Sequence, residues 1–273
     1  MEVCIPDLFD LKKIADSGQC FRAVPLGSGT YRFITGDQVL YIRKMADEVY
    51  EVSCDRNTWE HVWYPYFDLG RNYREISGQI PAEDTFLGVA AESGAGIRIL
   101  RQDPWETLVT FIISQRKSIP AIRAVVETLS RRYGAVIPTS AEILYAFPTA
   151  QQMKAVTVED YLTCKAGYRA PYLCDAVEQV LSGRLDLAGI AALPDDGLIA
   201  ALEEVRGVGV KVANCVALFA YGRTACAPVD TWIRKVLQQE YQGRDPFDRY
   251  GAAAGIMQQY FFYYAQSHKA ETA

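Results

Sequence analysis

The sequence predicts an α+β protein, with an antiparallel β-rich N-terminal domain in residues 1–97 and an all-helical domain in residues 98–273. Short runs of β-branched and aromatic residues, separated by Gly-Asp and Asp-Glu pairs, are typical of a strand meander in the first region. From residue 98 onward, apolar residues recur with the period of a helix, and Asp, Pro and Gly stand where helices begin and end. A chain of 273 residues is long enough to bury a substantial core.

We take the elements in order along the chain. A short helix is expected over residues 9–15, strands within residues 29–54, and helical structure near residues 59–68. Asp103, Pro104 and Glu106 together predict a helix start, because Asp caps, Pro suits the first turn and Glu favours the third position. Further helices are expected over residues 119–133, 141–147, 150–157, 158–163, 168–181, 195–204, 211–221, 231–241 and 250–266.

The charge balance excludes a protein that binds nucleic acid by overall charge alone. Lys and Arg number 28 against 33 Asp and Glu, which gives a net charge of −5. Binding to DNA would therefore need a local basic face. One segment offers it, with seven basic residues against the three acids Asp103, Glu106 and Glu127: Arg98, Arg101, Arg116, Lys117, Arg123, Arg131 and Arg132.

Cysteine usage and the N-terminus predict an intracellular protein. The seven cysteines include no C-x-x-C pair and none lies beyond Cys226, so neither a disulfide scaffold nor a C-terminal iron–sulfur cluster is expected. We find no secretory signal, and the longest apolar stretch, residues 212–221, is too short to span a bilayer. We expect a monomer without membrane association, cytoplasmic and nucleoid-associated if the source is prokaryotic.

A glycine-rich turn between two predicted helices is the most informative stretch. Gly207 and Gly209 permit a tight hairpin and a close approach of another backbone. The N–H groups of Gly209, Val210 and Lys211 would then face outward at a helix N-terminus, where one DNA phosphate can bind. An ordinary helix–helix turn is the alternative interpretation.

Two charged residues near this turn have the right types for chemistry on a sugar. Lys211 opens a helix that is apolar almost all round, at the end where positive charge is disfavoured, so we expect a fraction of neutral, nucleophilic amine. Asp230 stands where an N-cap belongs, and a carboxylate held there could also steady positive charge on a sugar. A solvated lysine and a purely structural cap are the alternative interpretations.

Gly-Val-Gly-Val-Lys followed by Pro-Val-Asp, with Asp230 nineteen residues after Lys211, resembles the helix–hairpin–helix DNA glycosylase superfamily. Other motifs resemble its 8-oxoguanine DNA glycosylase family, and the resemblance runs from about residue 15 to residue 266. These motifs are Ser-Gly-Gln-Cys-Phe-Arg (17–22), Gln-Asp-Pro-Trp-Glu (102–106), Phe-Ile-Ile-Ser-Gln (111–115), Gly-Tyr-Arg-Ala (167–170) and residues 254–262. The resemblance implies a bifunctional DNA glycosylase and AP lyase of base excision repair, which flips 8-oxoguanine out of double-stranded DNA.

The resemblance also implies roles for individual residues. Lys211 would attack the sugar C1′ and form a Schiff base that permits β-elimination, while Asp230 would stabilise the oxocarbenium charge. The Gly18 carbonyl would accept the N7–H of 8-oxoguanine, a hydrogen that guanine lacks. Gln258 and Phe262, four apart on one helix face, would meet the Watson–Crick edge and stack on the base. Cys215, four residues after Lys211, would pack on the opposite side of the base.

For DNA and ions, the resemblance implies contacts rather than a cofactor. Gly207, Gly209 and Val210 would bind phosphate, and Arg116, Lys117 and Arg169 would bind DNA around the lesion. No cofactor is required, and a structural monovalent cation is possible on the carbonyls of Glu203, Val205 and Val208. The chain departs from the family's pattern at four positions, which leaves the reading of the opposite base and one phosphate contact open: Arg116, Ala121, Arg206 and Trp232.

Two other functions stay open at this point. A glycosylase for alkylated bases usually works with the Asp and a water, so Lys211 argues against it. A non-catalytic protein would use the hairpin only to bind phosphate, and it would form no covalent adduct with DNA. Glycosylase branches with a C-terminal cluster are disfavoured, because the chain has no cysteines for it.

Overall fold

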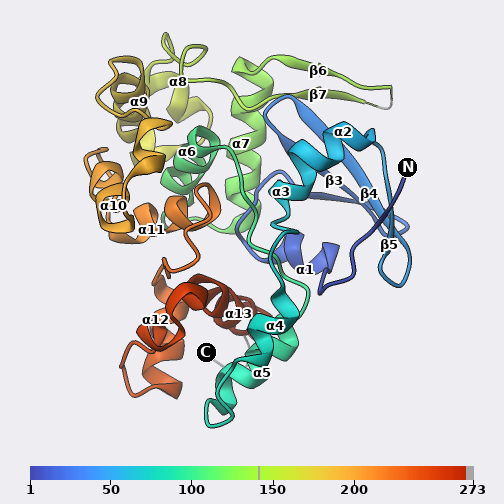
Figure 1. The fold of residues 1–273 in the computed structure, drawn as a ribbon. Coiled ribbons are helices and arrows are strands. Elements are labelled where there is room, and N and C mark those ends of the chain that lie inside the picture. The colour runs from blue at the N-terminus through green and yellow to red at the C-terminus, as the bar shows by residue number, and fades with distance from the viewer. Residues whose placement is uncertain (141, 269–273) are drawn as a thin grey trace. The chain divides into compact units, whose positions relative to one another are not determined.

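The computed structural model describes residues 1–140 and 142–268, and Figure 1 shows its ribbon. The chain forms two compact units, one of residues 1–32, 40–101 and 222–273 and the other of residues 33–39 and 102–221. The predicted class is confirmed, with an antiparallel sheet in the N-terminal part and mostly helices after it. The domain division at residue 97 stays a prediction.

The predicted strand meander is confirmed as part of a five-stranded sheet. Its strands β3, β4 and β5 cover Thr30–Thr35, Gln38–Ala46 and Val49–Val52. Two edge strands that we did not predict, β1 (Glu2–Cys4) and β2 (Val24–Gly27), complete the order β1-β5-β4-β3-β2. Both edge strands pair antiparallel with their neighbours over three residues, which is too short for a periodic signal in the sequence.

The helices of the first unit come from the segments before and after the sheet strands and from the C-terminal part of the chain. They are α1 (Leu11–Asp16), α2 (Arg56–Thr58), a π-helical turn (Trp59–Trp63), α3 (Tyr64–Tyr66), α4 (Tyr73–Gly78), α5 (Thr85–Gly94), α12 (Thr231–Glu240), a 3₁₀ segment (Phe247–Ala253) and α13 (Ala254–Ser267). The expected helix over residues 250–266 is wrong at its start, because Gly251 leaves helical geometry (φ 49°, ψ −123°) and α13 begins after it. In Figure 1, α13 runs beside α5.

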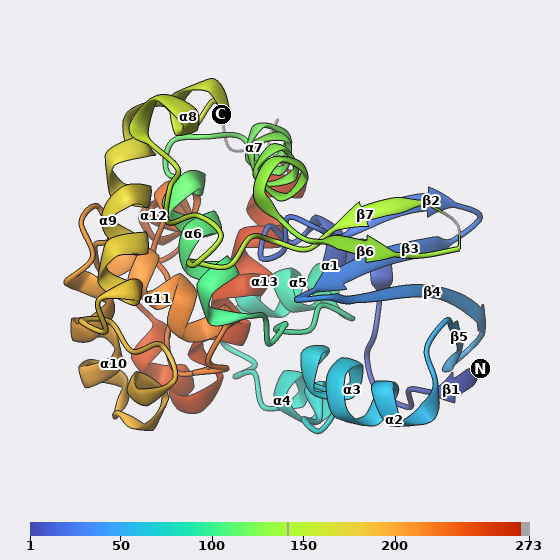
Figure 2. The ribbon, with the colours of Figure 1, turned by 90° about the horizontal axis from the view of Figure 1, so that it is seen from above.

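The second unit is built from helices and one two-stranded ribbon. Its elements are α6 (Pro104–Ser114), α7 (Ile119–Tyr133), β6 (Val136–Pro138), β7 (Ile143–Tyr145), α8 (Val158–Thr163), a 3₁₀ turn (Gly167–Arg169), α9 (Ala170–Leu181), a 3₁₀ segment (Gly189–Ala192), α10 (Asp195–Glu203) and α11 (Val210–Phe219). Seen from above, α6, α9, α10 and α11 lie together (Figure 2). The predicted start of α6 is confirmed, because the Asp103 carboxylate accepts the Glu106 N–H at 2.8 Å.

Two predicted helices of the second unit are wrong. Residues 142–147 contain strand β7, and residue 141 lies outside the described residues; the second region is therefore not all-helical. β7 pairs with β6, and Leu144 packs with Ile137 and Ile34, a non-local burial that local helix preference does not report. Residues 150–155 form consecutive turns instead of a helix. At their start the Thr149 N–H donates to the Gln152 side chain at 2.8 Å.

A buried arginine organises the first unit. Arg98 is fully buried, and its guanidinium donates to Asp7 at 2.6 Å and to the backbone carbonyls of Leu8, Phe67, Asp68 and Arg71. All of these hydrogen bonds are made inside the protein, so the guanidinium is not available to bind DNA at the surface. Counting Arg98 in a basic face for DNA is therefore wrong, whereas Arg101 is 45% exposed and pairs with Asp68.

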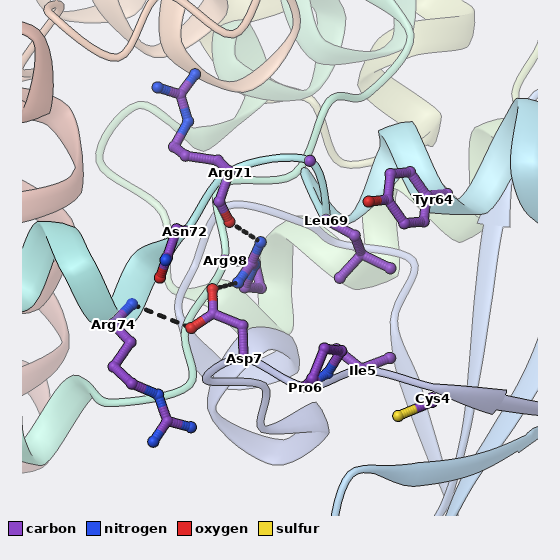
Figure 3. Close-up of a pocket in the computed structure, with 11 residues that line it drawn as sticks. Cys4, Ile5, Pro6, Asp7, Tyr64, Leu69, Arg71, Asn72, Arg74 and Arg98 are labelled. Atoms are coloured by element: carbon purple, nitrogen blue, oxygen red, sulfur yellow. Dashed lines mark hydrogen bonds and ion pairs between the residues drawn. The ribbon is translucent and has the colours of Figure 1, made fainter.

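Asp7 supplies the negative charge for this arginine, as Figure 3 shows. Burial raises the pKa of Asp7, but hydrogen bonds from the backbone of Tyr73, Leu8 and Arg74 and from the Arg98 side chain outweigh it, so the net pKa lies below its usual value. Because the folded-state pKa is lowered, the ionised form stabilises the fold above about pH 4, and this contribution disappears as the pH falls through the lowered pKa.

We predict that Asp7→Asn lowers the free energy of unfolding at neutral pH by about 3 kcal/mol, because the buried Arg98 loses its counter-charge. The variant should also lose less stability than wild type between pH 5 and pH 2. Urea unfolding at several pH values measures both effects. Parallel pH curves for the two proteins would contradict the assignment.

Candidate active site

The hairpin between α10 and α11 is a tight turn that only glycine allows. The Val208 N–H donates to the Val205 carbonyl at 2.9 Å and closes the turn. Gly207 has φ +83°, and a Cβ there would lie 2.3 Å from Cδ2 of Tyr172. Position 207 therefore excludes larger residues both by its backbone conformation and by the ring beneath it.

Helix α9 holds the turn from one side. The Asp175 carboxylate accepts the Arg206 N–H at 2.8 Å, and the Gln179 amide donates to the Glu204 carbonyl at 2.9 Å. Gln179 also donates to Asp175 at 3.0 Å. Because Tyr172, Asp175 and Gln179 recur every three or four residues, they lie on one face of α9. The sequence analysis missed all three, since the residues of the turn that they contact lie 25 or more positions away.

The segment after α6 holds the turn from another side. The Gln115 amide donates to the Gly207 carbonyl at 3.0 Å. Arg116 follows, exposed and with φ +50°, so it lies in the loop where we expected it. Lys117 donates to the Lys165 carbonyl at 2.9 Å, and burial, followed by the nearby charge of Arg169, lowers the pKa of its amine.

Arg169 differs from Arg116 in being buried. It is 5% exposed, and its guanidinium donates to the Ala166 carbonyl at 3.1 Å and lies 4.3 Å from the ring centroid of Tyr168. Its Nε has no hydrogen-bond partner among the described residues. Tyr168 itself is 52% exposed and covers the guanidinium, so this aromatic ring is the part of the pair that faces solvent.

The start of α11 leaves its backbone donors unused. Gly209 is the N-cap, and no side chain of the described protein caps the helix. The Ala213 N–H donates to the Gly209 carbonyl, which is a hydrogen bond of the first helical turn. The N–H groups of Gly209, Val210 and Lys211 come earlier in the chain and have no acceptor within the helix. Val210 is 64% exposed, so this end of the helix is open to solvent. The geometry is that of an anion site.

Lys211 and Cys215 lie one turn apart on α11. Lys211 is half-buried, and its Nζ lies 5.4 Å from the ring centroid of Phe111 on α6. Cys215 is 3% exposed. The lysine is thus the one charged side chain of a helix whose other residues, apart from Asn214 and the exposed Val210, are buried.

In the first unit, Asp230 has the predicted place at the start of α12. One oxygen of its carboxylate accepts the N–H groups of Trp232 and Ile233, each at 2.9 Å. Asp230 is half-buried, so its other oxygen is not committed to the helix by these bonds. The capping interpretation is correct, and it leaves room for a second role.

Helix α13 and the loop with Gly18 lie side by side in the first unit. Gln259 donates to the Ser17 carbonyl at 2.5 Å, which joins the two segments. Its neighbour Gln258 is 4% exposed, and its Oε1 has no hydrogen-bond partner in the described part of the chain. Phe262 is half-buried one turn later. A buried amide oxygen without a partner is uncommon in folded proteins, and it can accept a hydrogen bond from a bound ligand.

The described residues contain no group of three or more His, Cys, Asp or Glu side chains arranged to hold a metal ion. In residues 1–140 and 142–268 we also find no helix with the length and apolar character needed to cross a membrane.

Comparison with known proteins identifies the family to which the chain is similar. The family "8-oxoguanine DNA glycosylase, N-terminal domain" matches residues 3–108. The 8-oxoguanine glycosylase/lyase of Clostridium acetobutylicum, solved with double-stranded DNA that contains cytosine opposite 8-oxoguanine, is 35% identical with a TM-score of 0.92, covering 98% of each chain.

Two curated relatives are named as N-glycosylase/DNA lyases. The probable N-glycosylase/DNA lyase of Methanothermobacter thermautotrophicus is 28% identical over 77% of this chain and 75% of its own length. The N-glycosylase/DNA lyase of Saccharomyces cerevisiae is 32% identical over 65% of this chain, and the match spans 50% of that protein.

The matching family and these relatives define the class as DNA glycosylases with lyase activity. Within that class, the chain belongs to the 8-oxoguanine DNA glycosylase/lyase family.

We predict that Gly207→Ala destabilises the protein and weakens its binding to DNA. Gly183→Ala is the matched control, because Gly183 has a similar φ (+75°) but no atom lies within 4 Å of the position that an added Cβ would take. The control should cost about 1 kcal/mol for the backbone conformation alone, and Gly207→Ala about 2 kcal/mol more, because Tyr172 must move. Urea unfolding and fluorescence anisotropy on duplex DNA measure the two effects; equal losses for the two variants would contradict a packed hairpin.

Proposed function

We propose that this chain excises 8-oxoguanine from duplex DNA with Lys211 as nucleophile. The Nζ lone pair attacks C1′ of the flipped nucleotide, and the C1′–N9 bond breaks as the base leaves with the electron pair. Loss of a proton and ring opening give a Schiff base between Lys211 and C1′. Removal of a C2′ proton then expels the 3′ phosphate by β-elimination, which nicks the strand.

Asp230 stabilises the positive charge that develops on the sugar ring. Its carboxylate is held by two backbone N–H groups, so it needs no reorganisation when that charge appears.

The lesion is recognised in the first unit. The Gly18 carbonyl accepts the N7–H of 8-oxoguanine, and Gln258 hydrogen-bonds to the Watson–Crick edge. The buried, unpartnered Oε1 of Gln258 supports this role, because such an atom is costly unless a ligand satisfies it. Phe262 stacks on the base, and Cys215 packs on its opposite side.

DNA is held by backbone and side-chain groups. Gly207, Gly209 and Val210 place the hairpin against one phosphate, and the carbonyls of Glu203, Val205 and Val208 hold a monovalent cation there. Arg116, Lys117 and Arg169 act near the lesion and the opposite strand. The enzyme needs no catalytic metal or other cofactor and works as an intracellular monomer, in the cytoplasm and on the nucleoid if the source is prokaryotic.

The observation that carries this proposal is the half-buried Lys211 in the first turn of the uncapped, largely buried α11. We predict that borohydride traps a covalent adduct of wild type with DNA containing 8-oxoguanine, and that Lys211→Gln forms none. Lys154→Gln, an exposed lysine of the same unit, is the control and should trap like wild type. DNA binding by wild type without any adduct would instead indicate a non-catalytic protein.

Asp230→Asn separates the cap from the chemistry. Asn caps helices as well as Asp, so the melting temperature should stay within a few degrees of wild type. Base excision in single turnover should fall about 100-fold or more, because the negative charge is gone. Asp230→Ala should lose the cap as well, at a cost of about 1 kcal/mol in urea unfolding. Full activity in Asp230→Asn would leave the carboxylate with a structural role alone.

A further inference from the structure

The direction of the Gly18 carbonyl is not set by Gly18 itself. Glycine has no Cβ and adopts positive and negative φ with similar ease, and here φ is +74°. Its carbonyl can therefore point in a fixed direction only if the peptide groups on both sides are held. In this structure, buried side chains hold both of them.

The peptide before Gly18 is held by α13. Gln259, which is 2% exposed, donates its amide to the Ser17 carbonyl at 2.5 Å across 242 residues of sequence. The Ser17 hydroxyl, also buried, donates to the Ile14 carbonyl at 2.7 Å at the end of α1. The Ser17–Gly18 peptide group therefore has its oxygen fixed from one side and its residue fixed from the other.

The peptide after Gly18 is held by the side chain of Gln19. This amide is 1% exposed and donates to the Ser17 hydroxyl and to the Arg98 carbonyl, each at 2.8 Å. Its oxygen accepts the Leu100 N–H at 2.7 Å. Gln19 thus cannot rotate without losing three hydrogen bonds in a buried site, which costs free energy for each group left unpaired.

Among the described residues, no hydrogen-bond donor to the Gly18 carbonyl is found, while the Ser17 carbonyl beside it accepts the Gln259 amide. Loss of the Gln259 amide would free the Ser17–Gly18 peptide to turn, and with it φ of Gly18. A carbonyl without a fixed orientation is a poor acceptor for a single hydrogen on the base.

We propose that Gln259 is a specificity-determining positioning residue: it fixes the Gly18 carbonyl so that this one acceptor separates 8-oxoguanine from guanine. The inference rests on the proposed function, in which Gly18 accepts the N7–H of the lesion. It assigns Gln259 no contact with the base, in contrast to its neighbour Gln258.

The test compares binding with lyase chemistry in Gln259→Leu, which removes the donor and keeps most of the volume. Binding is measured in the Lys211→Gln background on two duplexes that differ only in 8-oxoguanine or guanine opposite cytosine. The preference for 8-oxoguanine should fall about tenfold, the worth of one hydrogen bond. With Lys211 present, borohydride trapping on a duplex with an abasic site should stay at the wild-type rate, because no base is there to be recognised.

Gln266→Leu, on the same helix and only half-buried, is the matched control and should change neither readout. Gln259→Met, which keeps the length of the side chain, replaces Gln259→Leu if the latter does not fold. An unchanged preference in a variant that traps normally would overturn the role of Gln259 and leave the proposed function standing. Equal losses in preference and in abasic trapping would show a merely structural role. A wild-type protein without any preference for 8-oxoguanine would overturn the proposed function itself.

Discussion

The burial of the Arg98 guanidinium is the constraint on which the first unit depends. A charge without contact with water is tolerated only when its donors are satisfied, and here one carboxylate and four backbone carbonyls do so. The residues that follow continue the pattern: the Ile99 N–H donates to the Tyr73 hydroxyl and the Leu100 N–H to Gln19. Because Gln19 flanks Gly18, the position of the proposed recognition carbonyl derives from this buried segment.

In the second unit, half-buried side chains likewise hold the backbone of the hairpin in one conformation. In the proposed function, the turn between α10 and α11 exposes backbone N–H groups to a phosphate, and exposed loops are mobile unless other residues hold them. Asp175 and Gln179 hold the turn by its Arg206 N–H and Glu204 carbonyl, and Gln115 holds it by the Gly207 carbonyl. The donors that remain free are those at the start of α11, next to Lys211.

The sequence predicted what local chemistry determines. α6, α7 and α10 were found because caps, proline and apolar periodicity lie within each helix, and Asp230 was recognised as a cap for the same reason. β7 was mistaken for a helix because its pairing with β6 and its packing on Ile34 depend on distant residues. Arg98 was counted as a surface charge because its partners, from Asp7 to Arg71, are not adjacent to it in sequence.

For the candidate site the division was the same. Lys211, Asp230, Gly18 and Gln258 stand in recognisable motifs, whereas the residues that hold them do not. Gln259 acts across 242 residues and Asp175 across 31, so neither has a local signal that marks its partner. One hint was present: two adjacent glutamines interrupt the apolar and aromatic run of residues 254–265 in α13, and both are buried.

The uncapped start of α11 has a thermodynamic consequence. With glycine at the N-cap, the helix forgoes roughly a few tenths of a kcal/mol that serine or aspartate at Gly209 would contribute. In the proposed function a DNA phosphate satisfies the same donors, so binding to DNA would add to the stability of the folded state. By mass action, the native state is then more resistant to heat and proteolysis on the nucleic acid than in free solution.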